Sequence, residues 1–308
     1  MLESQGYGLS EDRRFCKSVL GLRSIVDFIC NEFIHGGHLI ALSASAIALS
    51  AMILIDMLIR WEFLLIIYLG TYCIYNYDHY FGLDADLPNN SDRVSHLKKY
   101  HKLIPIIIVV YGIIFFFLLA WFGDLKSLLF GGLLLLSGLF YTSKVKKMTS
   151  KIVGFKNFYT ALSFSLLIIF TGVYCSYPLN YSLFLLFLFV LLRLFIDTSF
   201  CDIKDIESDR KQNLLTLPIY LGEQRFLFIL HIINFLSFVL IFIGILMNIL
   251  PLFSVFLFFF YIYCAYYLYK SKRHDVDIHF ISNVIVDGEQ MLWPLILILG
   301  KFFIAFIK

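Results

Sequence analysis

Three aspartates in one polar segment have the spacing of a metal site. The segment reads Asp202-Ile-Lys-Asp205-Ile-Glu-Ser-Asp209-Arg210. On a helix, at about 100° per residue, Asp202, Asp205 and Asp209 share one face. Carboxylates held so close repel one another unless a cation lies between them, and Mg²⁺ combines carboxylate oxygens with substrate phosphate oxygens. The pattern therefore favours a Mg²⁺–diphosphate site, and a solvated, mixed-charge helix face is the alternative.

A second acidic cluster follows an earlier apolar stretch and contains Asn76, Asp78, Asp84 and Asp86. On a continuous helix Asp78 and Asp86 lie about 80° apart, as do Asn76 and Asp84. Gly82 and Pro88 argue against one straight helix, so a polar helix end with a capped turn is the alternative interpretation. Two such clusters at membrane depth on one side of a bundle can converge over a cavity and grip a diphosphate between them.

Basic residues between and beside the two clusters supply charge for an anionic ligand, although membrane topology alone also explains lysines there. The predicted metal ligands are Asn76, Asp78, Asp84, Asp86, Asp202, Asp205 and Asp209, among which Asp78, Asp84, Asp205 and Asp209 are the predicted catalytic residues. The predicted diphosphate-binding residues are Arg93, Tyr141, Lys144, Lys146, Lys156 and Arg210.

The elements that must position these residues are membrane helices. Of the 308 residues, 60% are hydrophobic and 15% are charged, against about 45–50% and about 25% in soluble domains. A helix needs about 20 apolar residues to cross the hydrocarbon core. Nine stretches approach that length: 37–59, 61–77, 103–122, 125–142, 157–175, 180–198, 226–247, 250–270 and 284–306. We expect an all-α, polytopic membrane bundle of about nine transmembrane helices around a central cavity.

Lysine and arginine are unevenly distributed among the connections. In a nine-span arrangement, the N-terminal segment and the long connections 78–102, 143–156, 199–225 and 271–283 lie on one side and carry most of the basic residues. The positive-inside rule then puts the N-terminus and the acidic clusters in the cytoplasm and the C-terminus outside. The six cysteines form no C-x-x-C pair, which argues against a zinc site or disulfide framework.

Two pairs of opposite charges lie about one helical turn apart within or beside the apolar stretches. Arg193 and Asp197 are one pair, and Asp56 and Arg60 are the other. Residues at this spacing are neighbours on a helix. We expect internal ion pairs without a chemical role.

The segment from Asp202 to Gly222 resembles the second signature of the UbiA superfamily of membrane prenyltransferases. That signature reads D-x-x-D-x-E-G-D, then glycine, T-L-P and L-G; here Ser208 and Asn213 stand in place of glycines. The stretch from Tyr141 to Asn157 resembles the family's Y-T…K segment. The nine-helix layout matches as well, so the likeness covers about residues 35–306.

The first signature of that family, N-D-x-x-D-x-x-x-D followed by arginine, is less regular in this chain. Asn76 and Asp84 match it, whereas Tyr77 and Tyr80 occupy the first two aspartate positions. Asp78 and Asp86 can substitute through a shift of register. The arginine, Arg93, comes later than usual.

The resemblance implies a cytoplasmic N-terminal segment, 1–34, and a transmembrane prenyltransferase domain, 35–308. It implies Mg²⁺-dependent transfer of an isoprenyl group from its diphosphate to a small acceptor, aromatic or another lipid precursor, within the bilayer and without a nucleic-acid partner. The alternatives are a non-catalytic or lipid-binding relative and an ion-coupled transporter. Transporters hold their coupling carboxylates near the bilayer midplane, whereas these aspartates lie at span ends.

Overall fold

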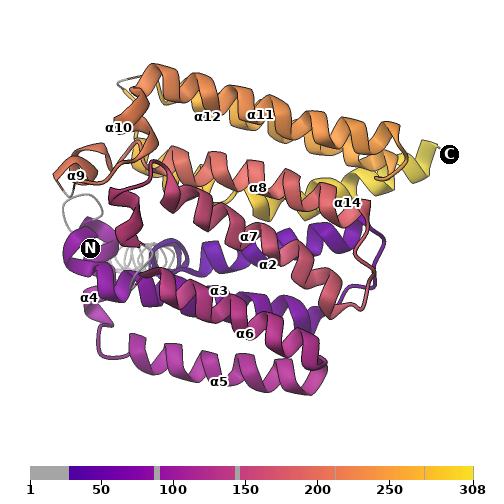
Figure 1. The fold of residues 1–308 in the computed structure, drawn as a ribbon, viewed down its shortest axis with the longest axis horizontal. Coiled ribbons are helices and arrows are strands. Elements are labelled where there is room, and N and C mark those ends of the chain that lie inside the picture. The colour runs from indigo at the N-terminus through magenta and orange to yellow at the C-terminus, as the bar shows by residue number, and fades with distance from the viewer. Residues whose placement is uncertain (1–27, 87–90, 143–145, 212, 274, 308) are drawn as a thin grey trace, which may run out of the picture.

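The computed structural model describes residues 28–307 apart from 87–90, 143–145, 212 and 274. In this part of the chain the regular elements are all helical, and the long helices lie side by side (Figure 1). The long helices are α2 (His38–Leu54), α3 (Trp61–Asp86), α5 (Ile104–Phe122), α6 (Leu125–Phe140), α7 (Phe155–Tyr174), α8 (Tyr181–Cys201), α11 (Glu223–Leu246), α12 (Phe259–Lys270) and α14 (Glu289–Ile307). The short ones are α4 (Ser91–Lys99), α9 (Ile206–Lys211), α10 (Leu217–Leu221), α13 (Ile278–Phe280), the 3₁₀ helices η2 (Lys146–Ser150) and η3 (Leu252–Phe258), and the π-helix η4 (Ile281–Val286).

Eight of the nine predicted apolar stretches coincide with one of these long helices and 250–270 coincides with η3 followed by α12, which confirms the all-α membrane bundle. Within the described residues, six segments are long and apolar enough to cross a membrane: α5, α7, α8, α11, η3 with α12, and α14. A seventh is α2 taken with the helix Phe28–His35, which meets it at a bend of 61°. The other two long helices do not meet this criterion. Helix α6 has only 16 residues, and α3 is long but rich in tyrosine and polar side chains.

Small side chains let α2 lie at the centre of the bundle. Its sequence is rich in alanine and serine, and most of it is buried between α3, α7 and α14. Ser45 Oγ donates a 2.8 Å hydrogen bond to the carbonyl of Leu64 on α3, and Ser43 Oγ donates a 2.7 Å bond to the carbonyl of Asp287 beside α14. Such residues are typical of membrane helix interfaces, where close backbone approach replaces the hydrophobic driving force.

The predicted ion pairs one turn apart are wrong. Nη2 of Arg193 lies 2.5 Å from both carboxylate oxygens of Glu289 on α14, and Nη1 donates to Asn234 at 2.6 Å. Asp197 instead accepts a 3.1 Å hydrogen bond from the hydroxyl of Tyr267. Asp56 pairs with Lys301 at 2.8 Å, and Arg60 pairs with Glu62 at 2.5 Å. The buried Arg193 finds its partner on a facing helix, which spacing along one helix does not reveal.

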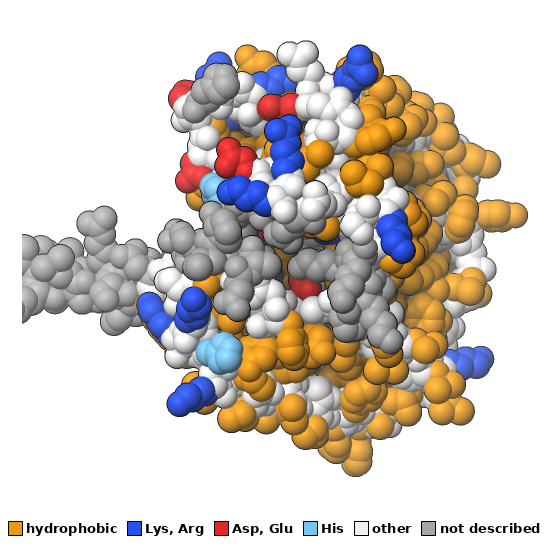
Figure 2. All heavy atoms as spheres, turned by 60° about the vertical axis from the view of Figure 1, so that its left-hand side comes forward, with side chains coloured by type: hydrophobic (Ala, Val, Ile, Leu, Met, Phe, Trp, Pro, Cys, Tyr) orange, Lys and Arg blue, Asp and Glu red, His pale blue; other side chains and the backbone are white. Residues whose placement is uncertain are grey.

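The polar connections gather at one end of the bundle. Helices α4, α9 and α10 all lie at that end, on the left of Figure 1, far from the C-terminal end of α14. Figure 2 looks onto this end: basic, acidic and histidine side chains cluster on it, and hydrophobic side chains cover the adjoining flank. The fold thus brings both acidic segments to the same end.

Candidate active site

The second aspartate motif spans a helix end, a tight turn and a new helix. Helix α8 ends at Cys201, and α9 begins at Ile206. Between them the amide of Asp205 donates to the carbonyl of Asp202 at 3.2 Å, three residues back, before the amide of Asp209 donates to the carbonyl of Asp205 at 2.8 Å. The expectation of one continuous helical face is therefore wrong, because a turn with i→i−3 bonds rotates the chain faster than an α-helix.

Asp202 is clamped by the start of α7. It is 1% exposed, and its Oδ1 lies 2.8 Å from Nζ of Lys156. Its Oδ2 accepts a 2.8 Å hydrogen bond from the side-chain amide (Nδ2) of Asn157, a residue that is fully buried. A buried carboxylate requires such partners. Sequence analysis did not select Asn157, although its place next to Lys156 at a helix start is a usable signal.

Asp209 lies beside this clamp and is less well satisfied. It is 5% exposed, and its Oδ2 is buried without a hydrogen-bond partner among the described residues. Burial and the negative charges of Asp202 and Asp205 raise the pKa of Asp209 to about 6, against the opposing charge of Lys156. An unsatisfied buried carboxylate with a raised pKa is characteristic of a functional site.

Backbone contacts hold the basic segment against the second motif. The amide of Leu215 donates to the carbonyl of Thr149 at 3.2 Å, and the amide of Gly154 donates to the carbonyl of Leu215 at 3.2 Å. Gly154 has φ +67° and would bring a Cβ to 3.1 Å from Leu217, so glycine is required where α7 begins. These contacts fix Lys156 and Asn157 next to Asp202.

Asn213 explains one departure from the family signature. It has φ 56°, in the left-handed region, two residues after the end of α9. The amide of Leu214 then donates to the carbonyl of Asp209 at 2.9 Å, closing the end of the helix. Asparagine is the usual substitute for glycine at such a position.

Tyr141 lies near side chains of both aspartate motifs. This tyrosine stacks on Tyr159 with ring centroids 5.3 Å apart, and its hydroxyl interacts electrostatically with Lys156, Asp78 and Asp202. Carboxylates from both motifs therefore lie around one tyrosine.

The remaining predicted residues differ in their placement. Asn76 is buried and donates from Nδ2 to the carbonyls of Gly36 at 3.1 Å and Tyr72 at 3.2 Å. Arg93 is 8% exposed and contacts His79 and Asn283. Asp205 is half-buried, and Arg210 is exposed. Outside the described residues or side chains lie Asp84, Asp86, Lys144 and Lys146.

The donor set suits a hard divalent cation in its chemistry, since it offers carboxylate oxygens, one of them the buried, unpartnered Oδ2 of Asp209. Among the side chains that the structure describes, no three from His, Cys, Asp and Glu converge closely enough to hold a metal ion. In this arrangement the Asp202 carboxylate forms an ion pair with the ammonium group of Lys156. The predicted ligand roles therefore stay predictions.

The match to a known family decides the class of the protein. The model of the UbiA prenyltransferase family matches residues 39–285. The chain belongs to this family. It is a multi-pass integral membrane prenyltransferase, a transferase of isoprenyl groups.

Solved structures of UbiA homologues have the same fold. An apo UbiA homologue from Aeropyrum pernix K1 is 14% identical with a TM-score of 0.66, covering 87% of this chain and 98% of its own. A homologue from Archaeoglobus fulgidus bound to GPP and Mg²⁺ is 13% identical with a TM-score of 0.64, covering 89% and 99%. A structure of digeranylgeranylglyceryl phosphate synthase is 16% identical with a TM-score of 0.57, covering 88% and 95%. No curated protein matches the chain.

Proposed function

We propose that this UbiA-family prenyltransferase moves an isoprenyl group from an isoprenyl diphosphate to a small acceptor, an aromatic compound or another lipid precursor, in a Mg²⁺-dependent reaction. The observation that carries the proposal is the buried carboxylate of Asp209, whose pKa is raised to about 6 beside Asp202 and Lys156. Solved homologues from Archaeoglobus fulgidus bound to GPP or DMAPP together with Mg²⁺ support the choice of donor and metal.

The residues of this end of the bundle divide into two roles under this proposal. The aspartates of both motifs, Asp205 and Asp209 above all, hold Mg²⁺, with Asp202 held ready by Lys156 and Asn157. When bound, Mg²⁺ neutralises the diphosphate as the allylic C–O bond ionises. Lys156, Tyr141, Arg93 and Arg210 add fixed positive charge or hydrogen bonds to the departing diphosphate, which is electrostatic stabilisation of developing charge.

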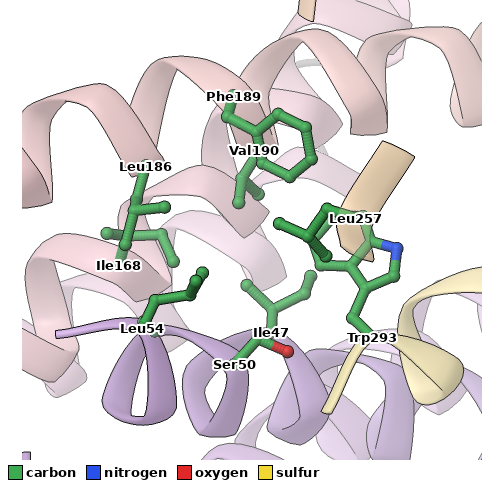
Figure 3. Close-up of a pocket in the computed structure, with 10 residues that line it drawn as sticks. Ile47, Ser50, Leu54, Ile168, Leu186, Phe189, Val190, Leu257 and Trp293 are labelled. Carbon is green, nitrogen blue, oxygen red and sulfur yellow. The ribbon is translucent and has the colours of Figure 1, made fainter. Parts of the chain in front are cut away.

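The apolar interior of the bundle is the proposed location of the isoprenyl chain. A small cavity of about 10 Å³ lies between α2, α7, α8, η3 and α14 (Figure 3). Its lining is Ile47, Ser50, Ala51, Leu54, Ile168, Leu186, Phe189, Val190, Leu257 and Trp293. A gap of this size holds about one water molecule, so an isoprenyl tail enters only if side chains such as Trp293 and Phe189 rotate. Exclusion of water from the bundle protects the reactive allylic cation.

The orientation that fits the charge distribution has the N-terminus and the acidic segments in the cytoplasm and the C-terminus outside. Basic residues on α4, the 143–156 segment and the 199–225 segment support it. A water-soluble diphosphate would then reach the site from the cytoplasm.

The alternative is a non-catalytic, lipid-binding member of the family. Tyr77 and Tyr80 at aspartate positions of the first motif favour it. It predicts isoprenyl lipid binding without turnover.

A direct assay distinguishes prenyl transfer from non-catalytic lipid binding. The purified protein in lipid nanodiscs is incubated with Mg²⁺, labelled geranylgeranyl diphosphate and a panel of acceptors, with and without EDTA. We expect Mg²⁺-dependent release of diphosphate and a labelled lipid product with at least one acceptor. Binding of the labelled diphosphate without turnover for any acceptor would favour the non-catalytic alternative.

A further inference from the structure

Three polar segments meet at one side chain that neither aspartate motif contains. Nζ of Lys204, within the second motif, donates a hydrogen bond to Oδ1 of Asn283. Nη2 of Arg93, on α4 after the first motif, lies 3.5 Å from the same oxygen. One amide oxygen thus joins the two motif segments to the segment that leads into α14.

The π-helix η4 positions Asn283 for this role. The amide of Asp287 donates to the carbonyl of Ser282 at 3.3 Å, five residues back, so the turn holds one more residue than an α-helical turn. Ile281 and Val286 are buried in the core between α8, α11 and α12, while Asn283 is half-buried. Single π turns often occur at functional sites because the extra residue re-aims the side chains.

A half-buried carboxylate, that of Asp287, offsets the positive charge of the two cations that meet at the Asn283 oxygen. Asp287, at the end of η4, interacts electrostatically with both Lys204 and Arg93. The carbonyl of Asp287 also accepts the hydrogen bond from Ser43 of α2. The junction is therefore anchored in the rigid centre of the bundle rather than in the connections themselves.

We propose that Asn283 is a positioning residue that fixes the first aspartate motif at a set distance from the second. Lys204 lies between Asp202 and Asp205 in sequence, so holding its ammonium restrains the turn that carries both aspartates. Arg93 restrains α4 in the same way. The catalytic part of this inference rests on the proposed function, in which the two motifs share one diphosphate. A shift of about 1 Å in such a site can lower the rate about 100-fold.

The test compares distances and kinetics in matched variants. Asn283→Leu removes the accepting oxygen at similar volume, Asn283→Asp keeps an accepting oxygen, and His279→Leu is the control, being an exposed residue of the same segment. Spin labels are attached through non-natural amino acids at Ser95 on α4 and Glu207 on α9, both exposed. If Asn283→Leu fails to fold, Lys204→Met repeats the test by removing the donor of the Lys204–Asn283 hydrogen bond instead of its acceptor.

We expect a narrow Ser95–Glu207 distance distribution in the wild type, Asn283→Asp and His279→Leu, and a broad one in Asn283→Leu and Lys204→Met. In Asn283→Leu the kcat for prenyl transfer should fall about 10- to 100-fold, and Asn283→Asp should restore most of it. An unchanged distance distribution in both Asn283→Leu and Lys204→Met would overturn the inference, and so would a broadened distribution with wild-type kcat. Absence of transfer in the wild type, with distances that broaden as expected, would refute the proposed function and leave the link between the segments standing.

Discussion

The ammonium group of Lys156 lies 2.8 Å from Oδ1 of Asp202. The two residues come from the start of α7 and the end of α8, and the carboxylate is 1% exposed. A positive charge from the basic segment thus lies within hydrogen-bonding distance of the first carboxylate of the second aspartate motif. The same lysine interacts electrostatically with Asp209 and Tyr141, so it is a common neighbour of these two side chains and Asp202.

Removal of Lys156 alone should destabilise the protein. Lys156→Met leaves the Asp202 carboxylate buried with Asn157 as its one remaining side-chain partner among the described residues, and such broken pairs cost about 3–5 kcal/mol. We expect a clear fall in the unfolding midpoint in detergent. The double variant Lys156→Met, Asp202→Asn should recover much of that stability, and simple additivity of the two single effects would contradict the pairing.

Asp209→Asn should stabilise the metal-free protein at neutral pH. The pKa of Asp209 rises from 3.8 to about 6 on folding. The contribution of the Asp209 carboxyl to the free energy of unfolding is therefore fully present below pH 3.8 and is lost as the pH rises through about 6. At pH 8 the substitution by neutral asparagine should raise the free energy of unfolding by roughly 2–3 kcal/mol, and at pH 4 it should change it by almost nothing. Equal melting temperatures of wild type and variant at pH 8 would contradict the burial described above.

The sequence predicts the helices better than it predicts the site. An apolar stretch inside a bilayer must satisfy its backbone hydrogen bonds internally, which favours a helix, and all nine predicted stretches coincide with helical segments. The second motif is only partly predictable: its residues gather as expected, but the turn at 202–205 interrupts the helical face. The clamp on Asp202 could not be foreseen from spacing, since Lys156 and Asn157 are more than 40 residues away in sequence.

The buried charges show the same limit. Sequence spacing pairs Arg193 with Asp197, whereas its partner in the structure, Glu289, lies 96 residues away on α14. Spacing along one helix identifies neighbours on that helix only. The meeting of Arg93, Lys204 and Asn283 likewise depends on three segments packing together.

Asp78→Asn tests how the irregular first motif works. If Asp78 has taken over the role of the aspartate that Tyr77 replaces, loss of its charge should lower kcat by several orders of magnitude, because a metal ligand is lost at nearly constant volume. We expect this result, given the electrostatic interaction of Asp78 with Tyr141. Asp56→Asn, at an exposed ion pair with Lys301, is the control and should keep full activity. A silent Asp78→Asn variant would remove Asp78 from the site.

Membrane orientation is checked by the accessibility of introduced cysteines. Ser95→Cys and Glu207→Cys lie on exposed parts of α4 and α9. Both should react with a membrane-impermeant maleimide from the cytoplasmic side only. A cysteine at Asn248, in the connection after α11, should react from the other side. Labelling of Glu207→Cys from outside would reverse the proposed topology.

The most direct measurement is Mg²⁺-dependent prenyl transfer by the second-motif variants. Asp205→Asn and Asp209→Asn are assayed in nanodiscs with labelled geranylgeranyl diphosphate and the best acceptor, after circular dichroism and gel filtration have shown each to be folded. Each variant should lose at least about 1000-fold in kcat, since the departing diphosphate is no longer neutralised. The Asp205→Asn, Asp209→Asn double variant should show no Mg²⁺-dependent turnover. Wild-type turnover in that double variant would show that these carboxylates take no part in the reaction.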